Sequence, residues 1–527
     1  MSHVAAAPLE IVTTAQDRPP IVGSVNKTLR EAIRDVDTGG LVSFDPSLRG
    51  QTIHLTQDQI NITKSCTINA SLIPGGVRVQ NATGRVFAAT ANNSVVTIKA
   101  LHIRGWIDDN LPGGGLFAGS GTDVRLDDCT FEDCRADGQT AIVHGGAVYS
   151  SGKLEVRRCA FLNNQAKDGG GAIAMLGTET SFVARNCLFV GNELTAASPA
   201  WGGAGVFSSG GGPLNIGHCT FVENDAKDGD AVIQNTNGLT VLGHNIFVSN
   251  DSIIYQSTAG TGVSVGYNLA DDDGFNFAIA SDRNQTFTAL EPLGYYGGRT
   301  TSMPPTPNSV AVDSGDPTFS SEMLDQRAFA RVTDGDDDGT MRVDIGAVER
   351  GGRVLVTSRL DEDDNTLTGS VSLREAVTLA PSGSRIRFAE SMAGAEILLT
   401  RELDLSKTLD IDARDLCQGI RLFAQNAPGS GLNQRLITVS APQEVISLSG
   451  FLMANGELAS SGSGAGIWVT QFTRTLHLRD CTLAFCQSAS GGGALHVDAG
   501  TSVLAENVTF TRTVSYTHLT LPTTSYV

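Results

Sequence analysis

The chain has 527 residues, including 60 glycines but only 7 tyrosines and 3 tryptophans, and its formal net charge is −19. This length exceeds one ordinary hydrophobic core, so we expect several domains or a repeat array. The acidic charge argues against nucleic acid as a partner, because phosphate binding needs a basic surface. No segment approaches the roughly 18 consecutive apolar residues of a membrane helix. The composition fits a soluble surface or extracellular protein that could use divalent cations.

The start of the chain, Met1 to Glu10, contains neither a basic n-region nor an apolar h-region, so no signal peptide is visible. The N-terminal segment as a whole comprises residues 1–23. We expect this N-terminal segment to be disordered or to form a strand. Residues 24–112 begin with a short helical pattern, Leu29-Arg30-Glu31-Ala32, and continue with alternating apolar and polar residues. We interpret them as a helical cap followed by the first coils of a repeat array, since a cap would cover strand edges that are otherwise unpaired.

Residues 113–260 carry the repeat. Five phenylalanines recur at intervals of 26 to 32 residues, and four of them begin the pattern Phe-x-x-Asn. A period of this length predicts a solenoid, and the strand-like alternation within each unit predicts β coils rather than α coils. The phenylalanines are Phe131, Phe161, Phe189, Phe221 and Phe247, and the asparagines are Asn164, Asn192, Asn224 and Asn250.

The repeat predicts an all-β fold, a parallel β-helix in which equivalent side chains of successive coils stack about 4.8 Å apart. The asparagines are expected in tight turns, where asparagine tolerates left-handed backbone. Glycine clusters such as Gly145-Gly146 and Gly169-Gly170 are expected at a second corner with positive φ. A β-sandwich could share the composition, but it would not produce a side-chain ladder at this period.

The nine cysteines also follow the repeat. Five of them, at positions 129, 159, 187, 219 and 481, stand two residues before a phenylalanine or leucine. This is a repeated position and not a zinc or C-x-x-C spacing, so we expect a buried ladder of free cysteines. Cys129/Cys134 and Cys481/Cys486 share a five-residue offset, and local disulfides within these pairs are the alternative.

Residues 261–350 form a closing segment with an aspartate-rich loop. Asp334, Asp336 and Asp338 lie on alternate residues and precede a glycine, as in the opening of a calcium loop. Position twelve of that loop is Ile345 instead of glutamate, so Asp344 or Glu349 would have to supply the missing oxygen. We predict a structural Ca²⁺ site formed by Asp334, Asp336, Asp338 and Asp344, and a solvated acidic turn is the alternative.

Other charged residues are interpreted as structural. Arg327 and Arg331 are expected to form ion pairs with Asp325 and Glu349 that fasten the closing segment. The repeated corner residues Lys167-Asp168 and Lys227-Asp228, with Asp225 and Asp230, could line one face as in glycoside hydrolases, but solvated turn residues are favoured. His144 and His218 are interpreted as ordinary surface or packing residues.

The chain contains a tandem duplication. Leu29-Arg-Glu-Ala-Ile and Leu373-Arg-Glu-Ala-Val lie 344 residues apart, and Phe44 and Phe388 keep the same offset. We therefore expect residues 351–513 to form a second β-helix unit that is truncated in mid-coil. Residues 514–527 resemble a translated sequencing adapter and are expected to be a non-native tail.

Three sets of motifs resemble known bacterial surface families. Thr28-Leu-Arg-Glu-Ala and Ser372-Leu-Arg-Glu-Ala look like the CSLREA domain without its leading cysteine, and the Phe-x-x-Asn coils look like polymorphic outer membrane protein repeats. Residues 290–349, with Asp325-Gln-Arg and Asp344-Ile-Gly-Ala-Val-Glu, look like the closing segment of choice-of-anchor Q proteins, although Ala328 stands where that family has glycine. The resemblance implies a secreted or surface-displayed right-handed β-helix, and it implies no reaction.

These features predict a non-catalytic bacterial cell-surface or secreted protein that acts as an adhesin, a stalk or a glycan-contacting scaffold. The expected partners are surface glycans or a neighbouring cell surface. The alternative is a polysaccharide lyase or glycoside hydrolase of the β-helix class. An acidic chain is a poor electrostatic match for an anionic polymer unless calcium bridges the two.

Overall fold

A computed structural model describes residues 9–515, apart from several short gaps. The chain divides into two compact units. Unit 1 contains the chain up to Glu349 apart from residues 295–297 and 337–340, and unit 2 contains those residues and the chain from Arg350 onward. The gaps are 74–75, 108–110, 139–142, 197–200, 228–230, 251–252, 272–278, 295, 297, 307, 319–323, 329–330, 337, 339, 351–352, 364–369, 381–382, 426–432, 442–444 and 459–461.

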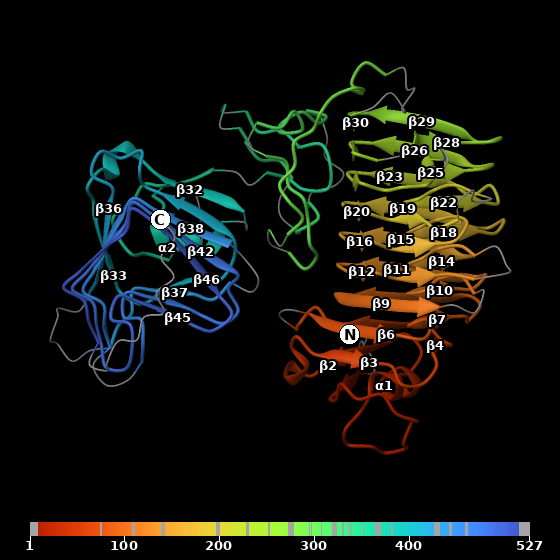
Figure 1. Cartoon of the computed structure of the whole chain (residues 1–527), viewed down its shortest axis with the longest axis horizontal. Helices are drawn as coiled ribbons and strands as arrows, with labels where there is room; N and C mark the ends of the chain where they lie inside the picture. Colours follow the sequence, from red (N-terminus) through yellow and green to blue (C-terminus); the bar gives the residue numbers. More distant parts are fainter. Residues whose placement is uncertain are drawn as a thin grey trace, which may run out of the picture. The chain divides into compact units, whose positions relative to one another are not determined.

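Unit 1 is a stack of parallel β coils (Figure 1), and successive strands of each sheet come from successive coils. The first sheet has the order β1 (Leu9–Val12), β2 (Gly40–Phe44), β5 (Cys66–Asn69), β8 (Ser94–Lys99), β11 (Thr122–Asp127), β15 (Lys153–Arg157), β19 (Ser181–Arg185), β23 (Leu214–Gly217), β26 (Leu239–Gly243) and β29 (Thr261–Gly266). The second has the order β28 (Ile253–Gln256), β25 (Ala231–Asn235), β22 (Val206–Ser209), β18 (Ile173–Leu176), β14 (Val148–Ser150), β10 (Leu116–Ala118), β7 (Phe87–Ala89) and β4 (Ile60–Ile62).

The third sheet of unit 1 is the one that the closing segment partly covers. Its strands are β3 (Thr52–His54), β6 (Val77–Asn81), β9 (Leu101–Ile107), β12 (Thr130–Glu132), β16 (Ala160–Leu162), β20 (Leu188–Val190), β24 (Thr220–Val222), β27 (Ile246–Val248) and β30 (Leu269–Ala270). The short strands β13 (Arg135–Ala136), β17 (Gln165–Ala166) and β21 (Glu193–Leu194) continue it from β9.

Unit 2 repeats the plan with fewer coils. Its largest sheet contains β31 (Arg353–Val356), β32 (Ser384–Phe388), β35 (Leu409–Asp412), β38 (Val445–Ser449), β42 (Thr475–Arg479) and β46 (Ser502–Glu506). A second contains β33 (Glu396–Leu399), β36 (Ile420–Ala424), β39 (Phe451–Ala454), β43 (Thr482–Ala484) and β47 (Thr509–Thr511), and a third contains β34 (Leu403–Leu405), β37 (Ile437–Val439), β41 (Ile467–Val469) and β45 (Leu495–Val497). The shortest sheet contains β40 (Glu457–Leu458), β44 (Gln487–Ser488) and β48 (Val514–Ser515).

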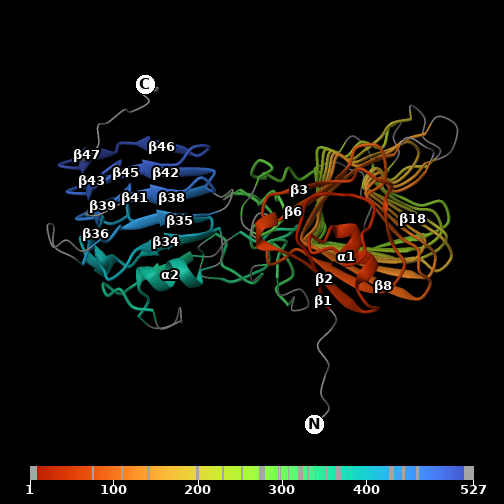
Figure 2. The same ribbon diagram turned by 90° about the horizontal axis from the view of Figure 1, so that it is seen from below.

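The first coil of each unit is covered by a short helix, α1 (Leu29–Asp35) or α2 (Leu373–Leu379), as Figure 2 shows for both. Thr28 and Ser372 begin these helices, and each forms a capping box with the glutamate three residues later. A one-turn 3₁₀ helix follows β2 and β32, at Pro46–Leu48 and Glu390–Met392. The expected helical cap and the expected pair of tandem β-helix units are both present.

The predicted phenylalanine ladder forms the core of unit 1. The rings of Phe131, Phe161, Phe189, Phe221 and Phe247 stack with successive centroid distances of 5.4, 4.8, 4.6 and 5.0 Å. All five side chains are buried. In-register parallel pairing places each ring over the next, so the repeat of the sequence becomes one continuous apolar column.

The cysteine ladder is also confirmed. Cys129, Cys159, Cys187 and Cys219 are buried in successive coils, and all nine cysteines are free, so neither local disulfide forms. Burial raises the pKa of Cys134 to about 12, which keeps that thiol protonated. The buried cysteines act as small apolar side chains in the core, whereas Cys417 is exposed.

One detail of the turns differs from the sequence-based expectation. The residues with left-handed backbone are those immediately before the asparagines, such as Asn163, Gly191 and Glu223, with φ of 52, 63 and 55°. The asparagines Asn164, Asn192, Asn224 and Asn250 form the next position, where each Oδ1 accepts a hydrogen bond from the preceding coil's backbone N–H. The asparagine side chains therefore form a ladder of hydrogen-bonded amides along the stack. The residue before each asparagine makes the turn. The glycine corner is as expected, with φ of 71, 67 and 82° at Gly145, Gly170 and Gly203.

Candidate functional site

The first residues of the predicted closing segment still belong to the coils, as β29 and β30. The described residues from 279 to 349, which are the closing segment proper, run along the outside of the third sheet (Figure 1). It bonds to one corner of successive coils, where Arg158, Asn186 and His244 have positive φ. Thr300 Oγ1 donates to Arg158 O at 3.2 Å, Asn186 Nδ2 donates to Leu324 O at 2.9 Å, and the Asp316 and Gly346 N–H groups donate to His244 Nε2 and O at 3.1 and 2.9 Å.

The segment covers an apolar strip on the outer face of that sheet. Leu290 and Met303 pack against buried outward-facing side chains of β16, β20 and β24, and Ala311 and Ile345 pack against those of β27 and β30. Burial of such side chains stabilises a contact by about 25 cal/mol for each Å² removed from water. The covered residues are Ala160, Leu162, Leu188, Val190, Val222, Ile246, Val248 and Leu269.

Arg331 is the central polar anchor of the segment, and its side chain is fully buried. Its guanidinium contacts Glu349 Oε2 at 3.2 Å and donates to Asn186 Oδ1 at 2.6 Å and to Gly346 O at 2.8 Å. Burial and the Asp344 carboxylate raise the pKa of Glu349, and Arg331 opposes that rise. The ion pair between Arg327 and Asp325 measures 2.8 Å. Both arginines thus form the expected ion pairs that fasten the closing segment.

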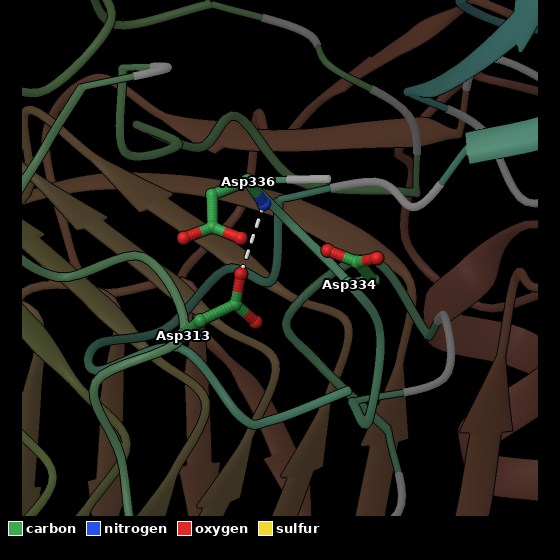
Figure 3. Close-up of side chains that lie close together, drawn as sticks. All are labelled: Asp313, Asp334 and Asp336. Carbon is green, nitrogen blue, oxygen red and sulfur yellow. Dashed lines mark hydrogen bonds between the residues drawn. The ribbon is translucent and has the colours of Figure 1, made fainter. Parts of the chain in front are cut away.

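Three aspartates of the closing segment lie together (Figure 3). One carboxylate oxygen from each of Asp313, Asp334 and Asp336 lies within 4.8 Å of the other two. Asp313 is 6% exposed, and its Oδ2 accepts hydrogen bonds from the Gly335 and Asp336 N–H groups at 2.8 and 2.9 Å. The loop is therefore wrapped around the buried carboxylate, with Asp334 and Asp336 at its rim.

Two of the four predicted ligands, Asp334 and Asp336, belong to this cluster, and two do not. Asp338 is exposed and its Oδ1 accepts a hydrogen bond from Thr340 N at 2.6 Å within its own loop. Asp344 is fully buried and its Oδ1 accepts from Asp313 N at 2.7 Å, so it positions Asp313 through the backbone. Asp313 was not predicted, because it lies 21 residues before Asp334 and only the fold brings the two together.

Beyond the closing segment, the outer face of the third sheet carries a polar patch, defined here as Arg78, His102, Arg104, Glu132 and Asp133. Arg78 Nη2 lies 3.2 Å from His102 Nδ1, and His102 Nε2 lies 2.7 Å from Glu132 Oε2. Arg104 lies 3.1 Å from Asp133, and these two side chains are 49% and 40% exposed. His102 lowers the pKa of Glu132, which burial alone would raise. The patch offers hydrogen-bond donors and acceptors of both charges to solvent.

Comparison with known proteins identifies the coil. Residues 49–268 match the family described as right handed beta helix region. This match confirms the right-handed parallel β-helix that the repeats predict. No curated protein matches the sequence.

Two solved structures align with this chain, the PL6 family alginate lyase AlyGC and an arginine-to-alanine mutant of that enzyme. Each is 12% identical over an alignment that covers 91% of this chain and 79% of the lyase chain. The TM-scores are 0.25 for the enzyme and 0.26 for its mutant.

The corner residues that could have formed a catalytic face instead make structural contacts within the β-helix. Asp168 is 6% exposed and its Oδ2 accepts a hydrogen bond from Val143 N at 3.0 Å. Lys227 Nζ lies 2.8 Å from Glu193 and also bonds to Asp225, and these contacts raise the pKa of Lys227. His144 and His218 are both buried. Asp228 and Asp230 lie outside the described residues.

Among the residues that the structure describes, no helix is both long and apolar enough to span a membrane.

Proposed function

We propose that this chain is a non-catalytic β-helix protein of the bacterial surface or of the secreted fraction, and that it contacts glycans as an adhesin or scaffold. The observation that carries the proposal is the division of the third sheet's outer face. That face is apolar where the closing segment covers it and polar at Arg78, His102, Arg104 and Glu132, where hydrogen-bonding side chains face solvent.

The chemistry of the polar patch favours a carbohydrate. Hydroxyl groups both donate and accept hydrogen bonds, and the patch supplies guanidinium donors beside carboxylate acceptors at successive coils. Arg78, His102 and Arg104 also give the patch cationic donors that a uronate carboxylate can approach, although Glu132 and Asp133 partly neutralise them. Solenoid flanks of this kind suit extended, repetitive ligands.

A non-catalytic role is favoured by the contacts of the corner residues. Asp168 is buried against backbone, and the Lys227 amine is held between two carboxylates, so neither is placed to exchange protons with a bound polymer. Lysine with a raised pKa is a poor general base.

The full chain tests the proposal directly. It is incubated with alginate, polygalacturonate and a neutral glucan, and binding is measured by affinity electrophoresis while cleavage is followed through reducing ends and unsaturated uronate absorbance. Binding without cleavage supports the proposal. Cleavage of any of these polymers establishes the lyase or hydrolase alternative, and the absence of binding to the whole panel overturns the glycan contact.

Two variants locate the contact. Arg104→Ala removes a guanidinium of the patch, and Arg125→Ala removes a comparably exposed guanidinium that pairs loosely with Glu155 on the first sheet. We expect Arg104→Ala to weaken binding several-fold and Arg125→Ala to leave it unchanged. Equal losses in both variants would place the binding elsewhere on the chain.

A further inference from the structure

The buried aspartate of the closing segment has an oxygen that lacks a hydrogen-bond partner. Asp313 Oδ1 is inaccessible to solvent and has no such partner among the described residues, whereas Oδ2 accepts two backbone N–H groups. A buried carboxylate oxygen without a partner costs free energy, because it has lost its hydrogen bonds to water. The unsatisfied oxygen belongs to the one carboxylate that Asp334 and Asp336 approach.

The backbone around Asp313 is built to hold its carboxylate in this position. Asp313 has a φ of 49°, its own N–H donates to Asp344 Oδ1 at 2.7 Å, and its Oδ2 fixes the turn at Gly335 and Asp336. Three carboxylates from two segments of the chain therefore converge without relying on flexible side chains alone. Such a group of hard oxygen donors is suited to Ca²⁺, which accepts irregular geometry and can complete its shell with water.

Two arginines lie near Asp313 and are the cationic groups that could pair with it instead of a metal ion. Arg283 and Arg342 line a cavity of about 280 Å³ next to Asp313, together with Tyr267, Ser314 and Pro317. Neither arginine forms an ion pair with Asp313 in the structure. A rearrangement that paired one of them with Asp313 would neutralise the cluster without an ion, and calcium would then produce no binding heat.

We propose that Asp313, Asp334 and Asp336 form a divalent-cation site, with Ca²⁺ as its ion, that ties the aspartate loop to the rest of the closing segment. Asp313 is the buried ligand, Asp334 and Asp336 are the rim ligands, and Asp338 takes no part. The ion links residue 313 to residues 334–336 and so holds the segment that covers the apolar strip of the third sheet. This proposal does not depend on the proposed glycan contact.

The test uses the full chain freed of metal by a chelator, with CaCl₂ as the only added ligand. Calorimetric titration should give one ion per chain at this site, and Ca²⁺ should raise the melting temperature of the wild-type protein. Asp313→Asn keeps an oxygen acceptor for the Gly335 and Asp336 N–H groups but removes the charge, and it should weaken Ca²⁺ binding about tenfold or more. Asp338→Asn, in the same loop but outside the cluster, is the matched control and should bind Ca²⁺ like the wild type.

Each other outcome overturns the proposal in a distinct way. An absence of binding heat together with an unchanged melting temperature means that the cluster is satisfied without an ion, for example by an arginine of the adjoining cavity. If Asp338→Asn weakens binding as much as Asp313→Asn, the ligands are those of the linear loop pattern. Asp336→Asn, at an exposed rim position, guards against misfolding of Asp313→Asn, and unaltered Ca²⁺ affinity in a folded Asp336→Asn protein also contradicts the site.

Discussion

Asp17 and Arg30 form a two-pronged ion pair beside the helical cap of unit 1, with Arg30 Nε and Nη2 at 2.9 and 3.1 Å from the two carboxylate oxygens. Asp361 and Arg374 repeat the pair in unit 2 at 2.8 and 2.9 Å. The same carboxylates accept the N–H groups of Thr56 and Thr400, which follow β3 and β33. Both units therefore share the same polar contacts between the cap helix and the first coil, namely the Asp–Arg ion pair and the threonine N–H bond, in addition to the helix sequence itself. These contacts are called the cap lock.

Removing the ion pair of the cap lock should destabilise the first coil of unit 1. The Asp17 side chain is 1% exposed and the Arg30 side chain is 15% exposed, so Arg30→Ala removes the cation that pairs with a nearly buried carboxylate. The expected cost is about 3–5 kcal/mol. Hydrogen exchange should quicken in α1 and β2 of Arg30→Ala and in α2 and β32 of Arg374→Ala. Arg125→Ala, which removes an exposed ion pair of 3.9 Å, is the control and should change stability by less than about 1 kcal/mol. Unchanged exchange in α1 would mean that the cap lock contributes little.

The phenylalanine column should be the most sensitive part of the core. Phe189 is fully buried between Phe161 and Phe221, with centroid distances of 4.8 and 4.6 Å. Phe189→Ala removes contacts with both neighbouring coils and leaves a cavity, so we expect a loss of about 3–5 kcal/mol. Urea denaturation followed by circular dichroism measures the loss. Phe287 is 73% exposed, and Phe287→Ala should stay within about 0.5 kcal/mol of the wild type.

The periodicity of the sequence was enough to predict the coils, because a single inward column of phenylalanine and cysteine defines both the repeat and the stacking. It could not place the left-handed turn, since Asn164 and its equivalents were assigned a backbone role that belongs to the preceding residue. That choice depends on how the coil bends and not on the preference of asparagine for turns.

A pattern in the sequence predicts which strands of the third sheet are covered on their outer face. Leu188-Phe189-Val190 is apolar at both faces of the strand, whereas Thr130-Phe131-Glu132 is apolar only inward. Strands buried on both faces read as continuous apolar runs, so the change between these coils marks where the closing segment begins to cover the sheet. The contribution of Asp313 had no such signal, because no local pattern links it to the loop at Asp334.

The attachment of the closing segment should weaken in acid because of His244. Burial and the nearby Arg331 guanidinium lower the pKa of His244 to about 4, although Asp316 opposes the shift. His218 and Tyr267 stack on the same ring at 4.4 and 5.0 Å. The folded protein therefore holds a neutral imidazole that accepts the Asp316 N–H, and the unfolded chain binds a proton more readily.

The stability that His244 contributes is complete above its unfolded pKa of about 6.5 and is lost as the pH falls toward 4. We expect hydrogen exchange at residues 313–318 and 343–347 to quicken over this range. His244→Gln keeps a side-chain amide that does not titrate, and it should flatten the dependence. An identical pH profile in that variant would show that other groups, such as the buried His218, control the transition.

Arg331 provides the sharpest test of how the closing segment is held. Arg331→Met fills similar space but leaves Glu349 buried without its cation and Asn186 Oδ1 without its donor, which should cost about 3–5 kcal/mol. Differential scanning calorimetry of the full chain measures the change. Since Glu349 already has a raised pKa, the double variant Arg331→Met with Glu349→Gln should recover part of the loss by removing the stranded charge. If the double variant is as unstable as the sum of the two single variants, Arg331 acts through its bonds to Asn186 and the Gly346 carbonyl and the ion pair adds little.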